Sequence, residues 1–207
     1  MFSGGSSMVE QSLFREAEGG SIPTTPLQVE LCHIKRIQPI IERVHYSHSI
    51  FGVTKDYCYA VTAGGCEVFG GAIFGKPAAF NVAQKYAGGG VLLELRRFVL
   101  EDWLPRNSES KYIGVMLRDL RKRGVGKILS YADPAHGHEG TIYKATGFKR
   151  LGKTSARKHV VWRGKKYPDR NIHQVNFPYH KELRAALECG EATRVAVPGK
   201  WIFLRQL

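Results

Sequence analysis

The residues best suited to chemistry lie in two polar segments of the 207-residue chain, at 45–46 and 133–143. Imidazole titrates near neutral pH, so His45 is a candidate general base, and Tyr46 beside it is able to orient a base. Asp133 follows a predicted strand, at the end where open α/β sheets place their ligands. Structural alternatives stay open. His45 and Tyr46 also fit a partly exposed helix end, and Asp133 fits a turn cap, because Asp before Pro is common in turns.

Histidines close to Asp133 raise the question of a metal. His136 and His138, with Asp133 and His45, form a candidate ligand set for a divalent cation. Two histidines at i, i+2 in a glycine-containing loop are not a standard ligand spacing, so the alternative is that they line a cleft or face phosphate. The cysteines contain no Cys-x-x-Cys pair, which favours buried free thiols over a zinc site. They are Cys32, Cys58, Cys66 and Cys189.

The charge of the chain points to a polyanionic partner. Lys and Arg number 31 against 18 Asp and Glu, a net charge of +13 with a pI near 9.7. Residues 151–207 alone contain twelve basic and four acidic side chains. Nucleic acid is therefore the expected ligand, although an acidic membrane surface attracts the same charge.

Hydrophobic periodicity predicts the elements that hold these residues. Residues 1–25 have no sustained pattern and form a predicted flexible leader. Strands are expected from Leu27, at 57–63 and 67–74 as a hairpin around Gly64-Gly65, and at 91–100, 125–131, 148–151 and 199–204. Helices are expected from Ile37 to Val44, from a cap at Asn107 or Ser108 to Gly124, and over 139–146, with 77–90 as a long loop. Gly70-Gly71 predicts a bulge or a close backbone approach.

This order of elements mixes antiparallel ribbons with βαβ crossovers, which predicts a single α+β (mixed α/β) domain. The chain has no apolar run of about 18 residues and no secretion signal, so the sequence predicts a soluble intracellular protein without a membrane partner. We expect a folded domain over 26–160 and a basic C-terminal extension, 161–207, packed on it.

The strand–helix order and the ending Ile142-Tyr143-Lys144-Ala145-Thr146-Gly147-Phe148 resemble the GCN5-related N-acetyltransferase fold. That resemblance implies a central, partly splayed β-sheet flanked by helices, with a tyrosine that often serves as general acid. The fold usually holds the pyrophosphate of coenzyme A in a glycine cradle at a helix N-terminus. Here the segment Asn107-Ser108-Glu109-Ser110-Lys111-Tyr112-Ile113-Gly114 lacks the cradle, and Glu109 repels phosphate.

A narrower resemblance involves the stretch from Leu129 to Phe148, LSYADPAHGHEGTIYKATGF, which is similar to the Mom family of phage proteins. His45-Tyr46, Leu95-Arg96-Arg97-Phe98 and the segment 105–113 support it, so the resemblance covers about 27–160. Members of this family convert adenine in phage DNA to N6-carbamoylmethyladenine, which protects the DNA from host restriction. The resemblance implies that His45, Tyr46, Asp133 and Tyr143 are catalytic. It places the protein in the cytoplasm of the infected bacterium.

The donor is expected to be an acyl or aminoacyl compound. A carbamoylmethyl group replacing one hydrogen adds the same atoms as a glycyl residue, so glycyl-tRNA is the candidate and acetyl-CoA is less favoured. Family resemblance also raises Fe2+ as a cofactor. We expect the donor to contact Arg96, Ser108, Ser110 and Lys111. A core tyrosine with a satisfied hydroxyl remains the structural alternative for Tyr143.

The acceptor is double-stranded DNA, from which the adenine must be flipped because its N6 lies inside the stack. Candidates for stacking are Tyr46, Tyr112, Tyr131 and Trp103, and for each of them packing within the protein is the favoured structural alternative. Tyr131, His136 and His138 are expected to contact the substrate. The densest basic cluster, interleaved with Trp162 and Tyr167, is expected to bind the DNA backbone. It contains Arg157, Lys158, Arg163, Lys165, Lys166 and Arg170.

Two other functions fit parts of this pattern. One is a coenzyme A-dependent N-acetyltransferase acting on protein or small amines, which tight coenzyme A binding without any change in DNA would favour. The other is a nucleic-acid binding module without catalysis, which would tolerate the loss of Asp133 and Tyr143.

Overall fold

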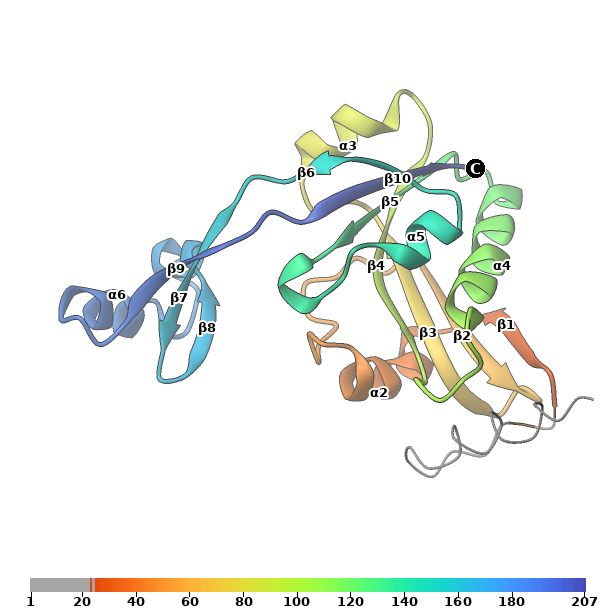
Figure 1. Ribbon diagram of the computed structural model, residues 1–207, viewed down its shortest axis with the longest axis horizontal. Coiled ribbons are helices and arrows are strands. Elements are labelled where there is room, and N and C mark those ends of the chain that lie inside the picture. The colour runs from red at the N-terminus through yellow and green to blue at the C-terminus, as the bar shows by residue number, and fades with distance from the viewer. Residues whose placement is uncertain (1–22, 24) are drawn as a thin grey trace, which may run out of the picture. The chain divides into compact units, whose positions relative to one another are not determined.

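A computed structural model describes residue 23 and residues 25–207, so the predicted leader over 1–25 lies almost wholly outside the described residues. The chain forms two compact units (Figure 1). Of the described residues, the first unit comprises those up to Leu129, Ala145–Gly147 and Arg205–Leu207, and the second comprises Ser130–Lys144 and Phe148–Leu204. Of the helices in the described part, none has the length and apolar character needed to span a membrane.

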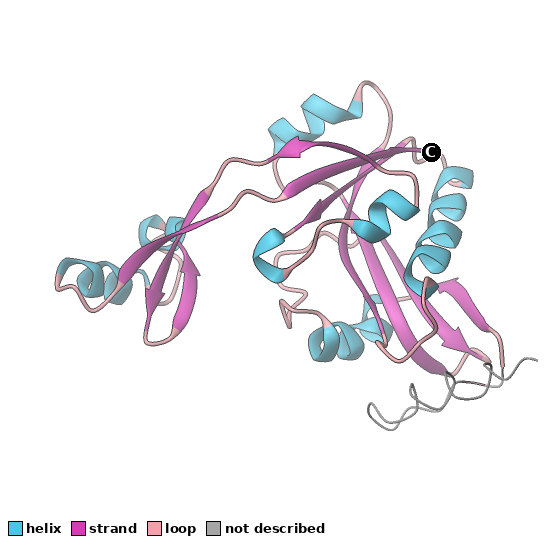
Figure 2. Cartoon of the chain, viewed as in Figure 1, coloured by secondary structure: helices cyan, strands magenta, loops and turns pink. Residues whose placement is uncertain are grey.

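The first unit is built on a mixed sheet in the order β1-β2-β3-β4-β5. Its neighbours are antiparallel except β4 and β5, which are parallel. The strands are β1 (Leu27–Leu31), β2 (Tyr57–Ala63), β3 (Glu67–Gly75), β4 (Leu92–Leu100) and the start of β5 (Lys127–Ala132). The helices are α2 (Ile34–Val44), α3 (Phe80–Ala87) and α4 (Ser108–Lys122). The mixed α/β class predicted from the sequence is confirmed (Figure 2).

Helices α2 and α4 pack on the sheet of the first unit through apolar stripes. Buried Ile37 and Ile41 of α2 share a cluster with Ile73 of β3. Side chains alternate between the faces of a strand, so Tyr59 points away from the face that its neighbour Cys58 shares with α2. The Tyr59 hydroxyl donates to Asp119 Oδ2 of α4 at 2.7 Å. The two helices therefore cover opposite faces.

Glycines fix two features of the β2–β3 hairpin. Gly64 and Gly65 have φ values of 56° and 73°, the left-handed pair that a tight hairpin turn favours. A Cβ atom on Gly71 would lie 2.8 Å from Ile37 Cβ, and one on Gly70 would lie 2.5 Å from Leu100 Cδ1. The predicted close approach at Gly70-Gly71 is thus confirmed.

The second unit contains the end of β5, β6 (Lys149–Lys153) and β10 (Trp201–Gln206) as far as Leu204, and the sheet order here is β5-β10-β6. Strands β10 and β6 are antiparallel. Beyond their ladder, the Thr154 N–H donates to the Lys200 carbonyl at 2.9 Å, and the Lys200 N–H donates to Thr154 Oγ1 at 2.9 Å. A single turn, η1 (Pro134–His136), and the short helix α5 (Thr141–Ala145) lie between β5 and β6.

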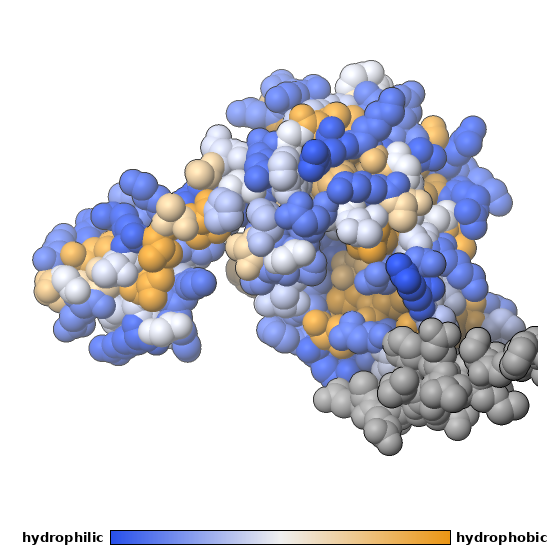
Figure 3. Space-filling view, viewed as in Figure 1, coloured by the Kyte–Doolittle hydropathy of each residue, from blue (hydrophilic) through white to orange (hydrophobic). Residues whose placement is uncertain are grey.

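A second, three-stranded sheet in the order β8-β7-β9 follows β6. It comprises β7 (Arg157–Trp162), β8 (Lys165–Pro168) and β9 (Thr193–Val197), accompanied by the turn η2 (Asp169–His173) and α6 (His180–Glu188). Val160, Trp162, Ile172, Leu183 and Ala186 form a core of its own. Over these strands, hydrophilic residues border an apolar strip (Figure 3).

Two local expectations were wrong, and two aromatic residues considered near the nucleic acid are buried. The predicted loop 77–90 contains α3, which has no buried residue, so no apolar stripe marked it. Cys66 and Cys189 are exposed free thiols rather than buried ones. Tyr112 is buried under α4 with the Lys111 ammonium over its ring, so it is not available for base stacking. Trp162 is 8% exposed and belongs to the core beside β7.

Candidate active site

His45 and Tyr46 follow the last turn of α2, in the first unit. The His45 N–H caps the helix by donating to Ile41 O, and its extended backbone (ψ 134°) ends the helix there. The Ser47 N–H donates to His45 Nδ1 at 3.1 Å, and Ser47 Oγ lies 2.8 Å from the same atom. A backbone N–H only donates, so Nδ1 accepts and a neutral ring holds its proton on Nε2. His45 therefore presents Nε2–H as a donor.

The Tyr46 ring packs against that imidazole in a tilted arrangement. The two ring centroids are 4.2 Å apart with an interplanar angle of 30°. Tyr46 is 43% exposed. A partly exposed aromatic face on a fixed ring is a suitable surface for stacking a planar base.

Strand β4 carries a cluster of partly buried charged residues, one of which, Arg97, lies near Tyr46. Ile73 pairs with Arg97 and Phe74 with Leu95, so Arg96 is the extra residue of a β-bulge, a device that re-aims side chains. Arg96 Nη1 lies 3.0 Å from Glu94 Oε2, with only 11% and 13% of the two side chains exposed. Burial raises the pKa of the Glu94 carboxyl, and Arg96 opposes this only in part. Arg96 is thus neutralised by an acid.

Arg97 ties the strand to the loop after Tyr46. Its Nε donates to the Ser49 carbonyl at 3.1 Å, and its Nη1 donates to the Arg96 carbonyl at 2.8 Å. Burial lowers the pKa of Arg97, and the nearby Tyr46 acts in the opposite direction. Arg97 and Ser47 hold the His45–Tyr46 segment in place, and neither was a predicted site residue.

A basic pocket of about 580 Å³ opens beside α4 in the first unit. It contains two of the predicted donor contacts, Ser110 and Lys111. Ser110 Oγ donates to the Asn107 carbonyl, and Asn107 caps the helix with φ 69°. Ser108 begins α4, and neither it nor Arg96 lines the pocket. The other lining residues are Gly114, Leu117, Arg118, Arg121, Ala145, Thr146, Gly147, Arg205 and Leu207.

The coenzyme A cradle of the acetyltransferase fold does not fit the start of α4. Positions 107–111 carry side chains where the fold uses glycine, and Glu109 stands in the first turn. Phosphate there would meet a carboxylate at the helix end that otherwise attracts anions. The basic side chains of the pocket differ from the start of α4 in this respect. Among the described residues, no Asp or Glu forms an ion pair with Lys111, Arg118, Arg121 or Arg205.

Asp133 follows β5 directly, as predicted, in the second unit. Its Oδ1 accepts from the Ala135 N–H at 3.1 Å and caps η1. Its Oδ2 lies 2.8 Å from Lys200 Nζ, with 9% of the Asp133 side chain and 25% of the Lys200 side chain exposed. Burial acts to raise the pKa of Asp133, but Lys200 and the Ala135 N–H outweigh it and hold the pKa below its ordinary value. Asp133 is therefore both a cap and half of an ion pair, and Lys200 was missed.

Tyr143 lies on α5 with its ring among aromatic neighbours. Its centroid is 5.5 Å from Phe148 and 5.3 Å from Phe203. The Phe148 N–H donates to the Tyr143 carbonyl at 2.9 Å across Gly147, whose φ is 76°. The spacing Tyr, three residues, Gly-Phe therefore builds the end of α5 and fixes the tyrosine ring.

The remaining predicted contacts are Tyr131 near the end of β5, His136 at the end of η1 and His138 two residues after it. The rings of His136 and His138 are 6.5 Å apart and both residues are exposed, while Tyr131 is half-buried. Across residues 23 and 25–207, no group of three or more His, Cys, Asp or Glu side chains is arranged to hold a metal ion. The Fe2+ expectation does not fit this arrangement.

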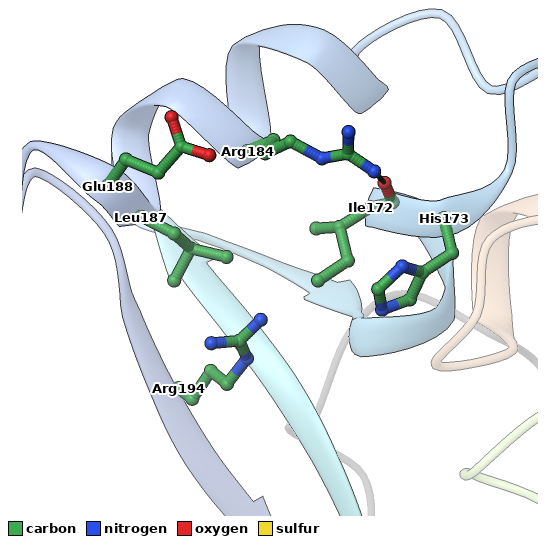
Figure 4. Close-up of a pocket in the computed structure, with 6 residues that line it drawn as sticks. All are labelled: Ile172, His173, Arg184, Leu187, Glu188 and Arg194. Atoms are coloured by element: carbon green, nitrogen blue, oxygen red, sulfur yellow. Dashed lines mark hydrogen bonds between the residues drawn. The ribbon is translucent and has the colours of Figure 1, made fainter.

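Five of the predicted DNA contacts lie on β7, β8 and the turn between them. All are exposed, and none forms an ion pair with a described acidic residue. They are Arg157, Lys158, Arg163, Lys165 and Lys166. A pocket of about 430 Å³ between η2, α6 and β9 is mixed in charge, because Arg184 and Arg194 share it with Glu188 (Figure 4). Arg194 is itself paired with Asp169 at 2.8 Å.

Comparison with known proteins identifies a family, a related sequence and a solved structure that are similar to this chain. The model of the Mom protein family matches residues 26–202. The methylcarbamoylase mom of Escherichia phage Mu is 29% identical over 131 residues, which are 61% of this chain and 54% of that protein. The chain thus spans about half the length of that curated relative. A solved structure assigned as an acetyltransferase, from Acinetobacter baylyi, superposes with a TM-score of 0.53 at 10% identity, covering 89% of this chain and 95% of that chain. The acetyltransferase-like fold is confirmed.

Proposed function

The chain belongs to the Mom protein family, and from this we propose that it converts adenine in phage DNA to N6-carbamoylmethyladenine and so protects the DNA from restriction. One observation carries the proposal: the family match over 26–202 includes every residue selected as catalytic from the sequence. The methylcarbamoylase of phage Mu, the curated relative, supports the same chemistry.

In the second unit we assign the central roles to Asp133, Lys200 and Tyr143. The adenine N6 amine is conjugated with the ring and is a poor nucleophile, so the reaction needs a proton acceptor, a proton donor and stabilisation of an oxyanion. The lowered pKa keeps Asp133 ionised, and its carboxylate holds the Lys200 ammonium at a fixed position. Lys200 then stabilises negative charge that develops on the donor carbonyl, Tyr143 is the proposed acid, and the ionised Asp133 is the proposed acceptor of the proton that the attacking amine loses.

In the first unit we assign substrate positioning to His45 and Tyr46. The exposed face of Tyr46 stacks on the flipped adenine. His45 donates from Nε2, because Ser47 engages its Nδ1. This role differs from the general base suggested by the residue type alone.

The donor we propose is a glycyl compound, with glycyl-tRNA as the candidate. The basic pocket beside α4 supports a donor with phosphate groups, because Lys111, Arg118, Arg121 and Arg205 line it. Two routes balance the atoms: acylation of N6 followed by rearrangement, or attack of the glycine amine on C6, after which the released ammonia converts the ester to the amide. In both routes the glycine nitrogen becomes the nitrogen attached to the ring.

The test of DNA modification is nucleoside mass spectrometry on plasmid DNA from cells that express the protein. We expect N6-carbamoylmethyladenine with the wild type and a loss with Asp133→Asn, which retains a side-chain oxygen for the Ala135 N–H. Asp169→Asn is the matched control, since it breaks another Asp ion pair of the second unit, and it should leave the product unchanged. Folded, expressed wild-type protein that leaves adenine unmodified would contradict the proposal and favour an N-acetyltransferase or a binding module.

The donor is tested with tRNA charged with 15N-glycine. The label should enter the modified nucleoside and stay with the purine when the side chain is fragmented. If the DNA is modified without label, the glycyl donor is wrong while the DNA activity stands.

A further inference from the structure

The tip of the β7–β8 hairpin has an unusual backbone. Only Arg163 and Gly164 connect the strands, and Trp162 pairs directly with Lys165. Arg163 has φ 49° and Gly164 has φ 72°. Two-residue turns with both φ values positive favour Asn-Gly, so an arginine at the first position is strained. Strain of this kind persists where the surrounding structure imposes it and where the side chain has a use.

The tip is held by a packed core. The Arg163 guanidinium carbon lies 4.5 Å from the centroid of the Trp162 ring, in cation–π contact. Trp162 is 8% exposed and shares its core with Val160 of β7 and Leu183 of α6. The charge of Arg163 therefore lies at the tip of a hairpin that is anchored through Trp162 to a packed core.

The charged side chains of the β7–β8 hairpin are all basic. From Arg157 to Pro168 the chain has five Lys or Arg residues and no Asp or Glu. Asp169, the acid that follows, is engaged by Arg194. A duplex DNA backbone is the complementary surface, and the DNA major groove admits a two-stranded β-ribbon.

One face of the β7–β8 hairpin also lies near the ion pair of Asp133 and Lys200. His159 lies on the sheet face opposite Val160 and Trp162. Burial lowers the pKa of His159, and the charges of Arg157 and Lys166 act in the same direction. The charges of Asp133 and Lys200 also affect the pKa of His159. The face that carries Arg157 and Lys166 therefore lies within electrostatic reach of the Asp133–Lys200 ion pair.

We propose that the β7–β8 hairpin is a DNA-docking ribbon that enters a groove of the duplex, with Arg163 at its tip and Lys165 and Lys166 on the phosphates. This rests on the proposed function, since it names the element that holds the DNA substrate. Trp162 supports the tip from the core and does not stack on bases.

The test is binding of the full chain to a short fluorescein-labelled DNA duplex, by anisotropy over a series of salt concentrations. Arg163→Asn removes the charge and places a residue that tolerates left-handed backbone, so the thermal midpoint should not fall. We expect affinity to fall about tenfold and the slope of log K against log salt to lessen by about 1. Lys181→Ala, a matched loss of one exposed cation on α6, should bind like the wild type.

The possible outcomes distinguish a failure of the DNA-docking proposal from a failure of the proposed function. Wild-type protein that binds and modifies DNA, with Arg163→Asn equal to it in affinity and salt slope, would overturn the ribbon alone. Dependence on Arg163 for single-stranded RNA but not for duplex DNA would also overturn it. If the wild type binds no DNA, the proposed function fails and the ribbon fails with it.

Discussion

Replacing Asp133 by asparagine isolates the ion pair with Lys200 from the cap on η1. The pair spans 2.8 Å, with 9% and 25% of its side chains exposed. Exposed pairs contribute about 0.2–1 kcal/mol, whereas breaking a fully buried pair costs about 3–5 kcal/mol. Burial here is intermediate, so we expect a coupling energy of about 2 kcal/mol between Asp133 and Lys200.

The assay is urea unfolding of the wild type, Asp133→Asn, Lys200→Met and the double variant, arranged as a double-mutant cycle. The same cycle on Asp169 and Arg194, which are 29% and 46% exposed, should give a coupling below about 1 kcal/mol. A coupling for Asp133 and Lys200 no larger than that of the exposed pair would refute the reasoning from burial.

The pH dependence of the same cycle has a defined sign. The folded-state pKa of Asp133 lies below its ordinary value, so its stabilisation is complete above the unfolded pKa, about 3.9. It is lost as the pH falls through the folded value. The stability advantage of the wild type over Asp133→Asn should therefore disappear in acid, below about pH 4. An advantage that grew on acidification would contradict this assignment.

Two further predictions concern positions outside this pair. Gly140 and Gly137 have φ values of 74° and 73°, but a Cβ on Gly140 would lie 2.3 Å from Phe203 while Gly137 faces open space. Gly140→Ala should therefore lower the unfolding free energy by about 1–3 kcal/mol more than Gly137→Ala, and equal losses in thermal or urea unfolding would contradict the clash. At about pH 8, Ellman's reagent should label exposed Cys66 rapidly and spare buried Cys58, because burial raises the pKa of the Cys58 thiol. Equal labelling rates for the two thiols would refute this protection of Cys58.

Sequence patterns predicted the elements whose residues face a core. The spacing of Ile37, Ile40 and Ile41 located α2, and Gly64-Gly65 located the β2–β3 turn, because both signals depend only on neighbouring residues. Helix α3 gave no such signal, since none of its residues is buried.

The candidate site was predictable only in part. Asp133 follows from its place after a strand, but Lys200, its partner, lies 67 residues later and no local pattern joins them. Trp162 illustrates the same limit: the sequence places this aromatic residue among the cations of the basic cluster, and the structure packs it in a core. Side-chain burial depends on tertiary packing, which residue type does not specify.

The paired backbones of Thr154 and Lys200 have an evolutionary consequence. Everything between them, including the basic hairpin, departs from and returns to one point of the sheet, where a Cβ on Gly199 would lie only 1.8 Å from the Thr154 carbonyl oxygen. Segments whose ends meet in this way are tolerated as insertions, and they can be exchanged or deleted with little change to their host. Under the proposed function, exchange of the 155–199 segment would alter the DNA contacts while the β6–β10 ladder persists, so that target preference and chemistry could diverge separately.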